Sequence, residues 1–342
     1  MIAVNWNDSM GLSKLGQALT AREIRNLVRD ELARVEQEIN LESIASADTV
    51  TAVSQYLQAN GGKRLRPMLL LMAAKLVGEA GPGAIRLAAI VEMIHAATLV
   101  HDDVIDDART RRGKPSANVV WGNHICVLAG DWLYMQAFQM ALRERNFAIL
   151  DILITLTQMM VEGELIQLER IGKISVTEAD YMELVDRKTA SLFAACARLG
   201  ALAGGADESG EARLADYAWN LGMAFQLVDD VLDFTAQESV LGKPVGNDLR
   251  EGKVTLPLIY ALDGASEPDR KMVETVLRDR SYERVPFPRI LEFIERRGGI
   301  ARARQRAQSF TEKARVIING FPESPCQRAL YAATDLITER DY

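Results

Sequence analysis

The sequence has few of the residues on which several common protein classes depend. Its 342 residues include only three cysteines, three histidines and 6% aromatic residues, and its net charge is −7. Nucleic-acid-binding chains usually show a basic balance or a basic stripe, so the acidic balance disfavours a nucleic-acid partner. The cysteines, Cys126, Cys196 and Cys326, are odd in number and lack metal-type spacing. We therefore expect reduced, mostly buried thiols and a reducing compartment.

Long apolar runs and targeting signals are also lacking. The longest apolar runs, such as residues 68–74, are far too short to span a bilayer. The first eight residues contain no basic stretch followed by an apolar core, so a secretory signal is not supported. These absences predict a cytoplasmic protein without a transmembrane segment.

The chain has ample material for a large helical core. Hydrophobic residues make up 48% of it and charged residues 25%. Apolar residues recur at three- and four-residue spacing almost everywhere, and no segment shows sustained strand alternation. There is no linker, low-complexity tract or clear internal repeat. We predict one all-α domain over residues 1–342, with residues 1–19 as a flexible N-terminal segment.

Several helices and one unusual loop can be placed along the chain. Residues 84–107 and 212–234 are predicted to form long helices that begin apolar and end acidic. Pro67 suits the first position of another helix, and Gly78 suits its end. Residues 237–253 contain three glycines, two lysines and a proline. A connection of this length in a helical domain is often functional, and we expect it to close over a site.

Two aspartate pairs occur near the ends of the two long helices. Asp102 and Asp106 are four residues apart, as are Asp229 and Asp233. This spacing places both carboxylates of a pair on one helix face, where they repel unless a cation lies between them. One such cluster alone could be a solvated acidic helix end, but two matching clusters indicate facing halves of one site. Such carboxylates suit magnesium, which fills its remaining positions with water and phosphate oxygens.

Basic residues that could face these aspartates lie in three segments. Residues 61–67, Gly-Gly-Lys-Arg-Leu-Arg-Pro, form a glycine turn with three cations at a helix start, where backbone N–H groups add positive potential. Arg111 and Arg112 follow the first aspartate pair, and Lys243 and Lys253 lie in the long loop. A structural salt-bridge network could use the same residue types, but it would need neither the glycine turn nor two matching aspartate motifs. The combination predicts a diphosphate-binding site.

At these motifs the sequence resembles the trans-type polyprenyl diphosphate synthases, and among them the long-chain group that makes octaprenyl-like products. The resemblance covers nearly the whole chain from about residue 20. The segments that carry it are Gly62 to Pro67, Asp102 to Asp106, Arg111 to Gly113, Lys188-Thr189, Phe225 to Asp230, Gly242-Lys243 and Asp248 to Pro257. It implies an isoprenoid synthase-type helical bundle around a deep central cavity, usually as a homodimer.

The resemblance also implies a role for each matching residue. The positions that match isopentenyl diphosphate ligands are Lys63, Arg66, His95 and Arg112. Those around the allylic diphosphate are Arg111, Lys188, Lys243 and Lys253. The residues that match the metal site are Asp102, Asp103, Asp106 and Asp229. Among these Asp103 is expected to have a supporting role, as are Asp230 and Asp233, which are not assigned to the metal.

The chemistry implied by the resemblance is ionisation, condensation and elimination. Three magnesium ions and the cations would stabilise the diphosphate that leaves the allylic substrate, expected to be farnesyl diphosphate. Lys188 would act on this diphosphate, while Thr189 and Gln226 could direct oxygen dipoles at the allylic cation. Structural hydrogen bonding is the alternative role for Thr189 and Gln226. The final proton would pass to the departed diphosphate.

Product length is expected to depend on residues about one turn before Asp102. In the resembling family a bulky aromatic residue there accompanies short products, whereas this chain has Ala97 and Thr98. The small side chain predicts a long product, octaprenyl to decaprenyl, which would supply quinone side chains. Close packing is the alternative role for Ala97. Deeper candidates for a tunnel floor are Met93, Met135, Phe138 and Gln139.

Other functions remain open at this point. A farnesyl- or geranylgeranyl-producing synthase is the main alternative. Terpene cyclases and head-to-head prenyl coupling enzymes also use aspartate-rich helices, but they do not need the basic segment 63–66. A non-catalytic partner subunit would be expected to lose aspartates, and both motifs are intact here. The apolar product suggests transient contact with a membrane during release.

Overall fold

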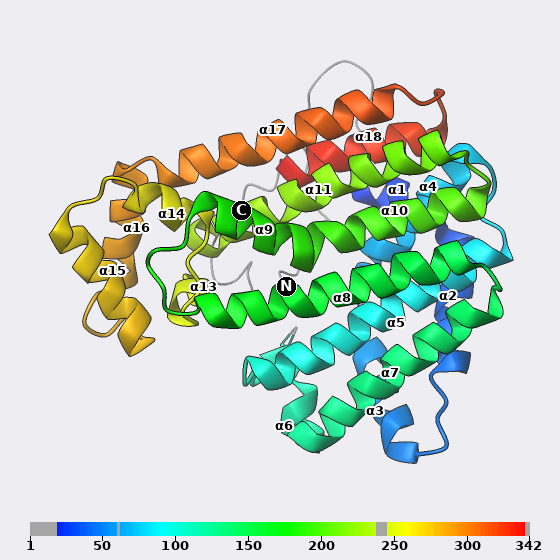
Figure 1. Cartoon of the computed structure of the whole chain (residues 1–342), viewed down its shortest axis with the longest axis horizontal. Helices are drawn as coiled ribbons and strands as arrows, with labels where there is room; N and C mark the ends of the chain where they lie inside the picture. The colour runs from blue at the N-terminus through cyan, green and yellow to red at the C-terminus, as the bar shows by residue number, and fades with distance from the viewer. Residues whose placement is uncertain (1–18, 60–61, 112, 237–244, 339–342) are drawn as a thin grey trace.

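The computed structural model describes residues 19–59, 62–111, 113–236 and 245–338. Within these ranges the prediction of an all-α fold is confirmed (Figure 1). Helices α1 to α5 span Ala21–Asn26, Arg29–Glu42, Asp48–Ala59, Leu65–Val77 and Pro82–Ile105. Helices α6 to α8 span Ala117–Trp121, Asn123–Arg143 and Phe147–Arg170. Helix α9 (Glu178–Val185) continues through a π-helical turn, η1 (Asp186–Ala190), into α10 (Ser191–Gly204). Next come α11 (Glu208–Thr235), α13 (Asn247–Arg250) and α14 (Leu256–Leu262). The last four, α15 to α18, span Glu267–Asp279, Phe287–Arg296, Gly299–Asn319 and Pro325–Thr338.

A short hairpin, which the sequence did not predict, follows α5. Strands β1 (Thr110–Arg111) and β2 (Lys114–Pro115) pair antiparallel, with Arg111 opposite Lys114. Two-residue strands are too short to show an alternating pattern, so periodicity could not reveal them. The hairpin lies directly after the first aspartate pair and brings Arg111 back toward α5.

The long helices of the middle of the chain lie side by side, with α5, α8, α10 and α11 running along the bundle (Figure 1). Helix α5 packs against α2, α4 and α7, and most of its residues are buried. By length and composition α5 could cross a membrane, but 72% of its most apolar stretch is buried inside the bundle. An apolar helix that is mostly buried in this way is typical of the interior of a helical bundle.

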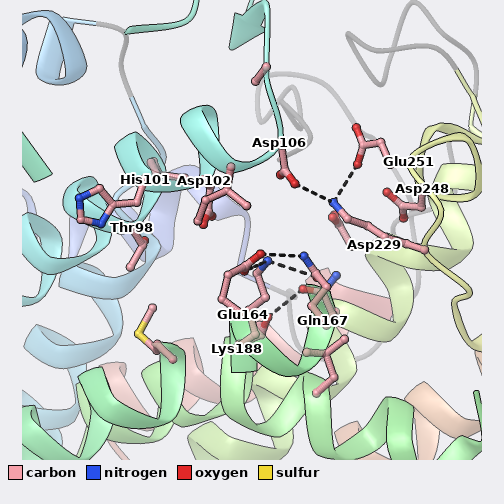
Figure 2. Close-up of a pocket in the computed structure, with 18 of the residues that line it drawn as sticks. Thr98, His101, Asp102, Asp106, Glu164, Gln167, Lys188, Asp229, Asp248 and Glu251 are labelled. Carbon is pink, nitrogen blue, oxygen red and sulfur yellow. Dashed lines mark hydrogen bonds and ion pairs between the residues drawn. The ribbon is translucent and has the colours of Figure 1, made fainter. Parts of the chain in front are cut away.

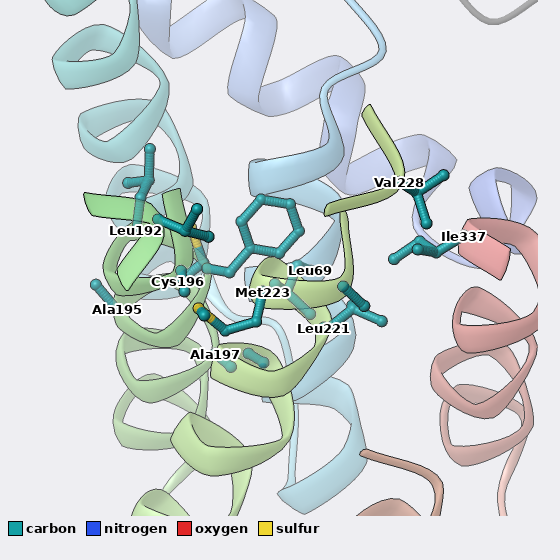
Figure 3. Packing of buried hydrophobic residues seen from close by; sticks show 14 of the residues in the cluster. Leu69, Leu192, Ala195, Cys196, Ala197, Leu221, Met223, Val228 and Ile337 are labelled. Atoms are coloured by element: carbon teal, nitrogen blue, oxygen red, sulfur yellow. The ribbon is translucent and has the colours of Figure 1, made fainter. Parts of the chain in front are cut away.

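The contact between α4 and α10 is close because α10 carries glycine there. A Cβ atom on Gly200 would lie 2.2 Å from the carbonyl oxygen of Leu70. Around this contact, Leu69 of α4, Cys196 of α10 and Met223 of α11 meet in the buried core (Figure 3). Each fully buried side chain of this kind contributes about 1.5–3 kcal/mol. This packing fixes the start of α4, which carries the basic segment, relative to α10 and α11.

Helix boundaries agree with the sequence predictions except at α4. The predicted helices 84–107 and 212–234 correspond to α5 and α11, and Gly78 is the C-cap of α4. Pro67, predicted at the first position of its helix, is the third residue of α4, which begins at Leu65. Proline is tolerated there because the first-turn N–H groups have no partner within the helix.

Candidate functional site

A cavity of about 1360 Å³ opens at one end of the bundle, between the C-terminal parts of α5, α8 and α11, with η1 and the start of α4 completing its wall. Most residues singled out in the sequence line it: Lys63, Arg66, His95, Thr98, Asp102, Asp106, Arg111, Lys188, Thr189, Gln226, Asp229, Asp230 and Lys253. Residues far apart in the sequence therefore meet here. Arg112, Lys243 and the first part of the predicted closing loop lie outside the described residues.

The two aspartate motifs approach the cavity from opposite sides. Figure 2 shows Asp102 and Asp106 of α5 on one side and Asp229 of α11 with Asp248 on the other. Burial raises the pKa of Asp102 to about 6, although the nearby ammonium of Lys188 acts against this shift. A partly desolvated carboxylate gains most from a cation, because little water competes for it.

Asp103 does not belong with these carboxylates, which corrects its place in the predicted metal set. Its side chain is 1% exposed, does not line the cavity, and accepts a hydrogen bond from Arg111 Nε at 2.6 Å. Asn118 Nδ2 also donates to the Asp103 carbonyl oxygen at 2.9 Å. Neighbouring helix residues point about 100° apart, so Asp103 leaves the face that carries Asp102. Its contact with Arg111 ties the hairpin to α5.

The second motif divides in the same way between cavity and interior. Asp230 lines the cavity but is buried and accepts hydrogen bonds from Tyr181 OH at 2.7 Å and from Gln226 Nε2 at 2.8 Å. Asp233 is also buried, lies away from the cavity, and accepts from the backbone N–H of Asp248 at 3.1 Å. Of the predicted pair Asp229 and Asp233, therefore, only Asp229 lines the cavity.

The basic segment at the start of α4 depends on an unusual backbone conformation. Arg64, the N-cap of α4, has φ 51°, in the left-handed region that side chains other than glycine rarely adopt. Its guanidinium pairs with Glu36 of α2 at 2.5 Å and with Glu92 of α5 at 2.6 Å. These pairs fix Arg64, and with it the neighbouring Lys63 and Arg66, which both line the cavity. The segment is thus a fixed cationic wall.

Lys188 and Lys253 enter the cavity already paired with carboxylates (Figure 2). Lys188 Nζ lies 2.5 Å from Glu164 Oε2 of α8. Lys253 Nζ lies 2.8 Å from Glu251 and 3.6 Å from Asp106. Burial alone would lower the pKa of Lys253, but these carboxylates outweigh it and raise the pKa. Both side chains therefore enter the cavity near the aspartates, each already in an ion pair.

Thr189 and Gln226 are joined by a hydrogen bond across η1 and α11. Thr189 Oγ1 donates to Gln226 Oε1 at 2.9 Å, and Gln226 Nε2 donates onward to Asp230. Both residues line the cavity, so a role toward a bound substrate and a structural role coexist in this geometry. The Gln226 amide is thus oriented by two neighbours, the hydroxyl of Thr189 at its oxygen and the carboxyl of Asp230 at its nitrogen.

Of the two residues expected to determine product length, Ala97 and Thr98, only one lines the cavity. Thr98 lines the cavity, but Ala97 is fully buried in the core and does not. Deeper in, the wall includes Tyr134 of α7 and Met160 of α8. The suggested floor residue Met135 is 63% exposed on the outside of α7. Tyr134, one residue before Met135, lines the cavity instead. The sequence alone could not show which face of α7 points into the cavity.

Three contributors to the site were missed in the sequence. Glu164 and Gln167 lie one turn apart on α8 and both contact Lys188. Their spacing was a usable signal, because polar residues at such intervals share a face of an otherwise apolar helix. Tyr181 gave no such signal, since its partner Asp230 is distant in the chain.

The donor set fits magnesium. In the part of the chain described here, no three acidic, histidine or cysteine side chains converge closely enough to hold a metal alone. Magnesium in proteins usually takes one or two carboxylates and completes its octahedron with water and substrate phosphate oxygens. Asp102, Asp106 and Asp229 supply such carboxylates around a space that also faces the cations.

Comparison with known proteins places this arrangement in context. The sequence model of the polyprenyl synthetase family matches residues 47–293. The octaprenyl diphosphate synthase of Escherichia coli (strain K12) is 35% identical over 323 residues, which cover 94% of this chain and 100% of that protein. A short chain isoprenyl diphosphate synthase of Methanothermobacter thermautotrophicus is 34% identical over 326 residues, 94% of this chain and 99% of that protein. The crystal structure of a decaprenyl diphosphate synthase from Rhodobacter capsulatus matches with a TM-score of 0.89 at 36% identity, covering 94% of this chain and 99% of that one.

Proposed function

The chain belongs to the polyprenyl synthetase family, and from this premise we propose that it condenses isopentenyl diphosphate repeatedly with an allylic diphosphate to give a long all-trans polyprenyl diphosphate. The observation that carries the proposal is that one cavity is lined by Asp102, Asp106 and Asp229 and also by the cationic segment of α4. Similarity to octaprenyl and decaprenyl diphosphate synthases supports a product of octaprenyl to decaprenyl length. A shorter product is the alternative, because a short chain isoprenyl diphosphate synthase is similar to this chain to nearly the same degree.

Magnesium is the metal we propose for the site, held by Asp102, Asp106 and Asp229. When bound, magnesium would stabilise the negative charge that develops on the allylic diphosphate as it leaves. Lys188 and Lys253 face the same space and would neutralise the outer phosphate oxygens.

The second substrate would be held by another set of cavity residues. Lys63 and Arg66 of the α4 start line the cavity, as does His95 of α5. They would bind the diphosphate of isopentenyl diphosphate and orient its double bond toward the allylic cation. After attack, a proton would be lost to the departed diphosphate, so no side-chain base is needed. The apolar residues of α5, α8 and α10 in the wall exclude water, which would otherwise quench the cation.

Product sizing tests this proposal directly. We expect the purified chain, given magnesium, farnesyl diphosphate and labelled isopentenyl diphosphate, to incorporate several labelled units per primer. Chromatography should show products of eight to ten isoprene units, as octaprenyl to decaprenyl length implies. A geranylgeranyl product would favour the short-chain alternative, and a cyclised product without label would contradict chain elongation. Activity of the single purified chain also excludes a non-catalytic partner subunit.

We also propose that the protein is a homodimer that pairs through α7 and α8. Large apolar side chains remain exposed along these helices: Leu128, Met135 and Leu142 on α7 and Phe147, Ile154 and Val161 on α8. Several large exposed apolar side chains on two helices that contact each other are typical of a protein–protein interface. A second copy is the occupant that this surface fits, since a two-fold interface needs the same apolar patch on both partners.

A charge placed on this surface should separate the subunits. Leu128→Asp combined with Ile154→Asp is expected to convert the dimer to a monomer, measured by sedimentation or light scattering. Both side chains are more than half exposed, so the fold should tolerate the change. Val316→Asp is the matched control, because Val316 is 75% exposed on α17, outside the proposed interface. A monomeric native protein, or an unchanged dimer in the double variant, would contradict the assignment.

A cytoplasmic location is proposed as well. All three cysteines are free and buried, which suits a reducing compartment. Release of the apolar product would then involve brief contact with a membrane, without a spanning segment.

A further inference from the structure

The π-helical turn η1 carries two residues of the site on its backbone. Lys188 and Thr189 both belong to η1, which interrupts the continuous run from α9 to α10. A π turn bonds each N–H five residues back instead of four, and it is uncommon because the wider turn packs poorly by itself. Neighbouring structure must therefore hold it in place.

Two glycines allow the neighbouring helices to close on η1 from both sides. A Cβ atom on Gly163 of α8 would lie 3.0 Å from Cβ of Arg187. A Cβ atom on Gly222 of α11 would lie 2.8 Å from Cα of Ala190. The π turn thus packs closely between the backbones of α8 and α11. A larger residue in place of Gly163 or Gly222 would clash with it.

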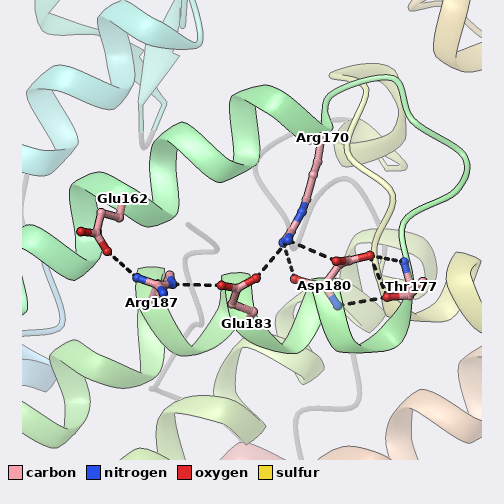
Figure 4. A network of polar contacts seen from close by, with 6 residues as sticks. All are labelled: Glu162, Arg170, Thr177, Asp180, Glu183 and Arg187. Atoms are coloured by element: carbon pink, nitrogen blue, oxygen red, sulfur yellow. Dashed lines mark hydrogen bonds and ion pairs between the residues drawn. The ribbon is translucent and has the colours of Figure 1, made fainter.

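A polar contact accompanies each glycine contact. Next to Gly163, Glu162 Oε2 pairs with Arg187 Nη1 at 2.5 Å. Arg187 Nε also lies 3.4 Å from Glu183 of α9, and Glu183 continues to Arg170 at the end of α8 (Figure 4). This row of ion pairs connects η1 to α8 along the outer side of the turn.

The inner contact is on α11. One turn before Gly222, Trp219 Nε1 donates a hydrogen bond to Asp186 Oδ1 at 2.6 Å. Trp219 itself packs edge-on against Phe310 of α17 at 5.7 Å between ring centroids. The first residue of the π turn is therefore anchored to a ring that is fixed in turn by another helix.

We infer that the Asp186–Trp219 and Arg187–Glu162 pairs position the π turn so that Lys188 and Thr189 face the allylic diphosphate. None of these four residues lines the cavity, so they act through the turn and not by contact with substrate. The inference rests on the proposed function and adds positioning residues to the allylic half of the site. The isopentenyl half, at Lys63 and Arg66, stands at the start of α4 and not on η1.

This separation gives the inference its own kinetic signature. Trp219→Phe removes the hydrogen bond to Asp186 and keeps an aromatic ring, while Arg187→Met removes the pair with Glu162 and keeps most of the side-chain volume. Each is expected to raise the KM for the allylic diphosphate by about 10-fold, because displacement of a binding group by about 1 Å has effects of this size or larger. The KM for isopentenyl diphosphate should stay within about twofold. Arg187→Lys should restore most of the loss, since it keeps a cation opposite Glu162.

Two matched controls separate positioning from loss of stability. Tyr217→Phe removes a buried hydrogen bond from the same helix, in which Tyr217 OH donates to Leu330 O at 2.6 Å. Arg198→Met breaks an ion pair of the same length, Arg198 to Glu211 at 2.5 Å, between α10 and α11. Both controls should lower the Tm as much as the test variants do and leave both KM values unchanged.

The outcomes decide separately on the inference and on the proposed function. Wild-type protein that incorporates no labelled isopentenyl diphosphate would refute the function. Active wild type with variants whose allylic KM stays within about twofold would refute the inference, as would equal rises in both KM values that track the loss of Tm. If Arg187→Met does not fold, Glu162→Gln provides the same comparison, because it removes the charge opposite Arg187 and keeps an oxygen acceptor.

Discussion

Replacement of Asp102 by alanine is expected to reduce condensation by about 10³-fold or more at saturating magnesium, since it removes a carboxylate from the proposed metal site. The loss should not come from unfolding. Asp102 is partly desolvated, with its pKa raised to about 6 by burial, so the metal-free fold gains no stability from it. We therefore expect the Tm of the metal-free variant to equal or exceed that of the wild type.

The measurement is the initial rate as a function of magnesium concentration, with farnesyl diphosphate and labelled isopentenyl diphosphate. Asp151→Ala is the matched control, because Asp151 is an exposed aspartate on α8 outside the cavity. Surface substitutions of this kind change stability by less than about 0.5 kcal/mol. The control should keep the full rate. Near-normal turnover of Asp102→Ala would show that the metal is held elsewhere.

Thr98→Phe is expected to shorten the product from octaprenyl or longer to geranylgeranyl or shorter. Thr98 lines the cavity one turn before Asp102, and its hydroxyl donates to the carbonyl of His95 at 2.8 Å. A phenyl ring here would occupy the path of the growing chain, whereas the diphosphate sites remain in place. Early condensations should continue at a rate close to that of the wild type. Product chromatography after a fixed number of turnovers provides the measurement.

Ala97→Phe provides the contrasting variant. Because Ala97 is fully buried in the core and does not line the cavity, a phenyl ring there should overpack the interior at a cost of about 1–3 kcal/mol. We expect a lower Tm with a largely unchanged product distribution. Shortened products from Ala97→Phe at an unchanged Tm, together with an unaffected Thr98→Phe, would reverse the assignment of these two positions.

The sequence predicted those features that depend on periodicity and spacing. Helix α5 could be placed because its apolar residues end in the Asp102–Asp106 pair, and matching pairs on α5 and α11 indicated one shared site. The basic segment before α4 was also visible, because glycine followed by cations at a helix start has a local signature. These signals involve residues within one or two turns of each other.

Features that depend on the direction of a single side chain could not be predicted. Ala97 and Thr98 are adjacent, and only the packing of α5 against its neighbours decides which one faces the cavity. Asp102 and Asp103 differ in the same way, since Arg111 and Asn118 hold Asp103 inside the fold. The π turn was hidden as well, because its cause lies in α8 and α11 and not in its own residues.

The pairing of the cavity lysines has a consequence for repeated turnover. In the structure Lys188 pairs with Glu164, and Lys253 pairs with Glu251 and Asp106. A diphosphate that enters must take these cations from carboxylates, so binding is an exchange of partners and not the capture of bare charge. The displaced carboxylates then compete with the diphosphate for the lysines, and they pair with the lysines again when the diphosphate departs. An enzyme that must expel one diphosphate in every cycle before the lengthened chain can return would gain from this built-in competitor, since tight retention of the by-product would stop elongation.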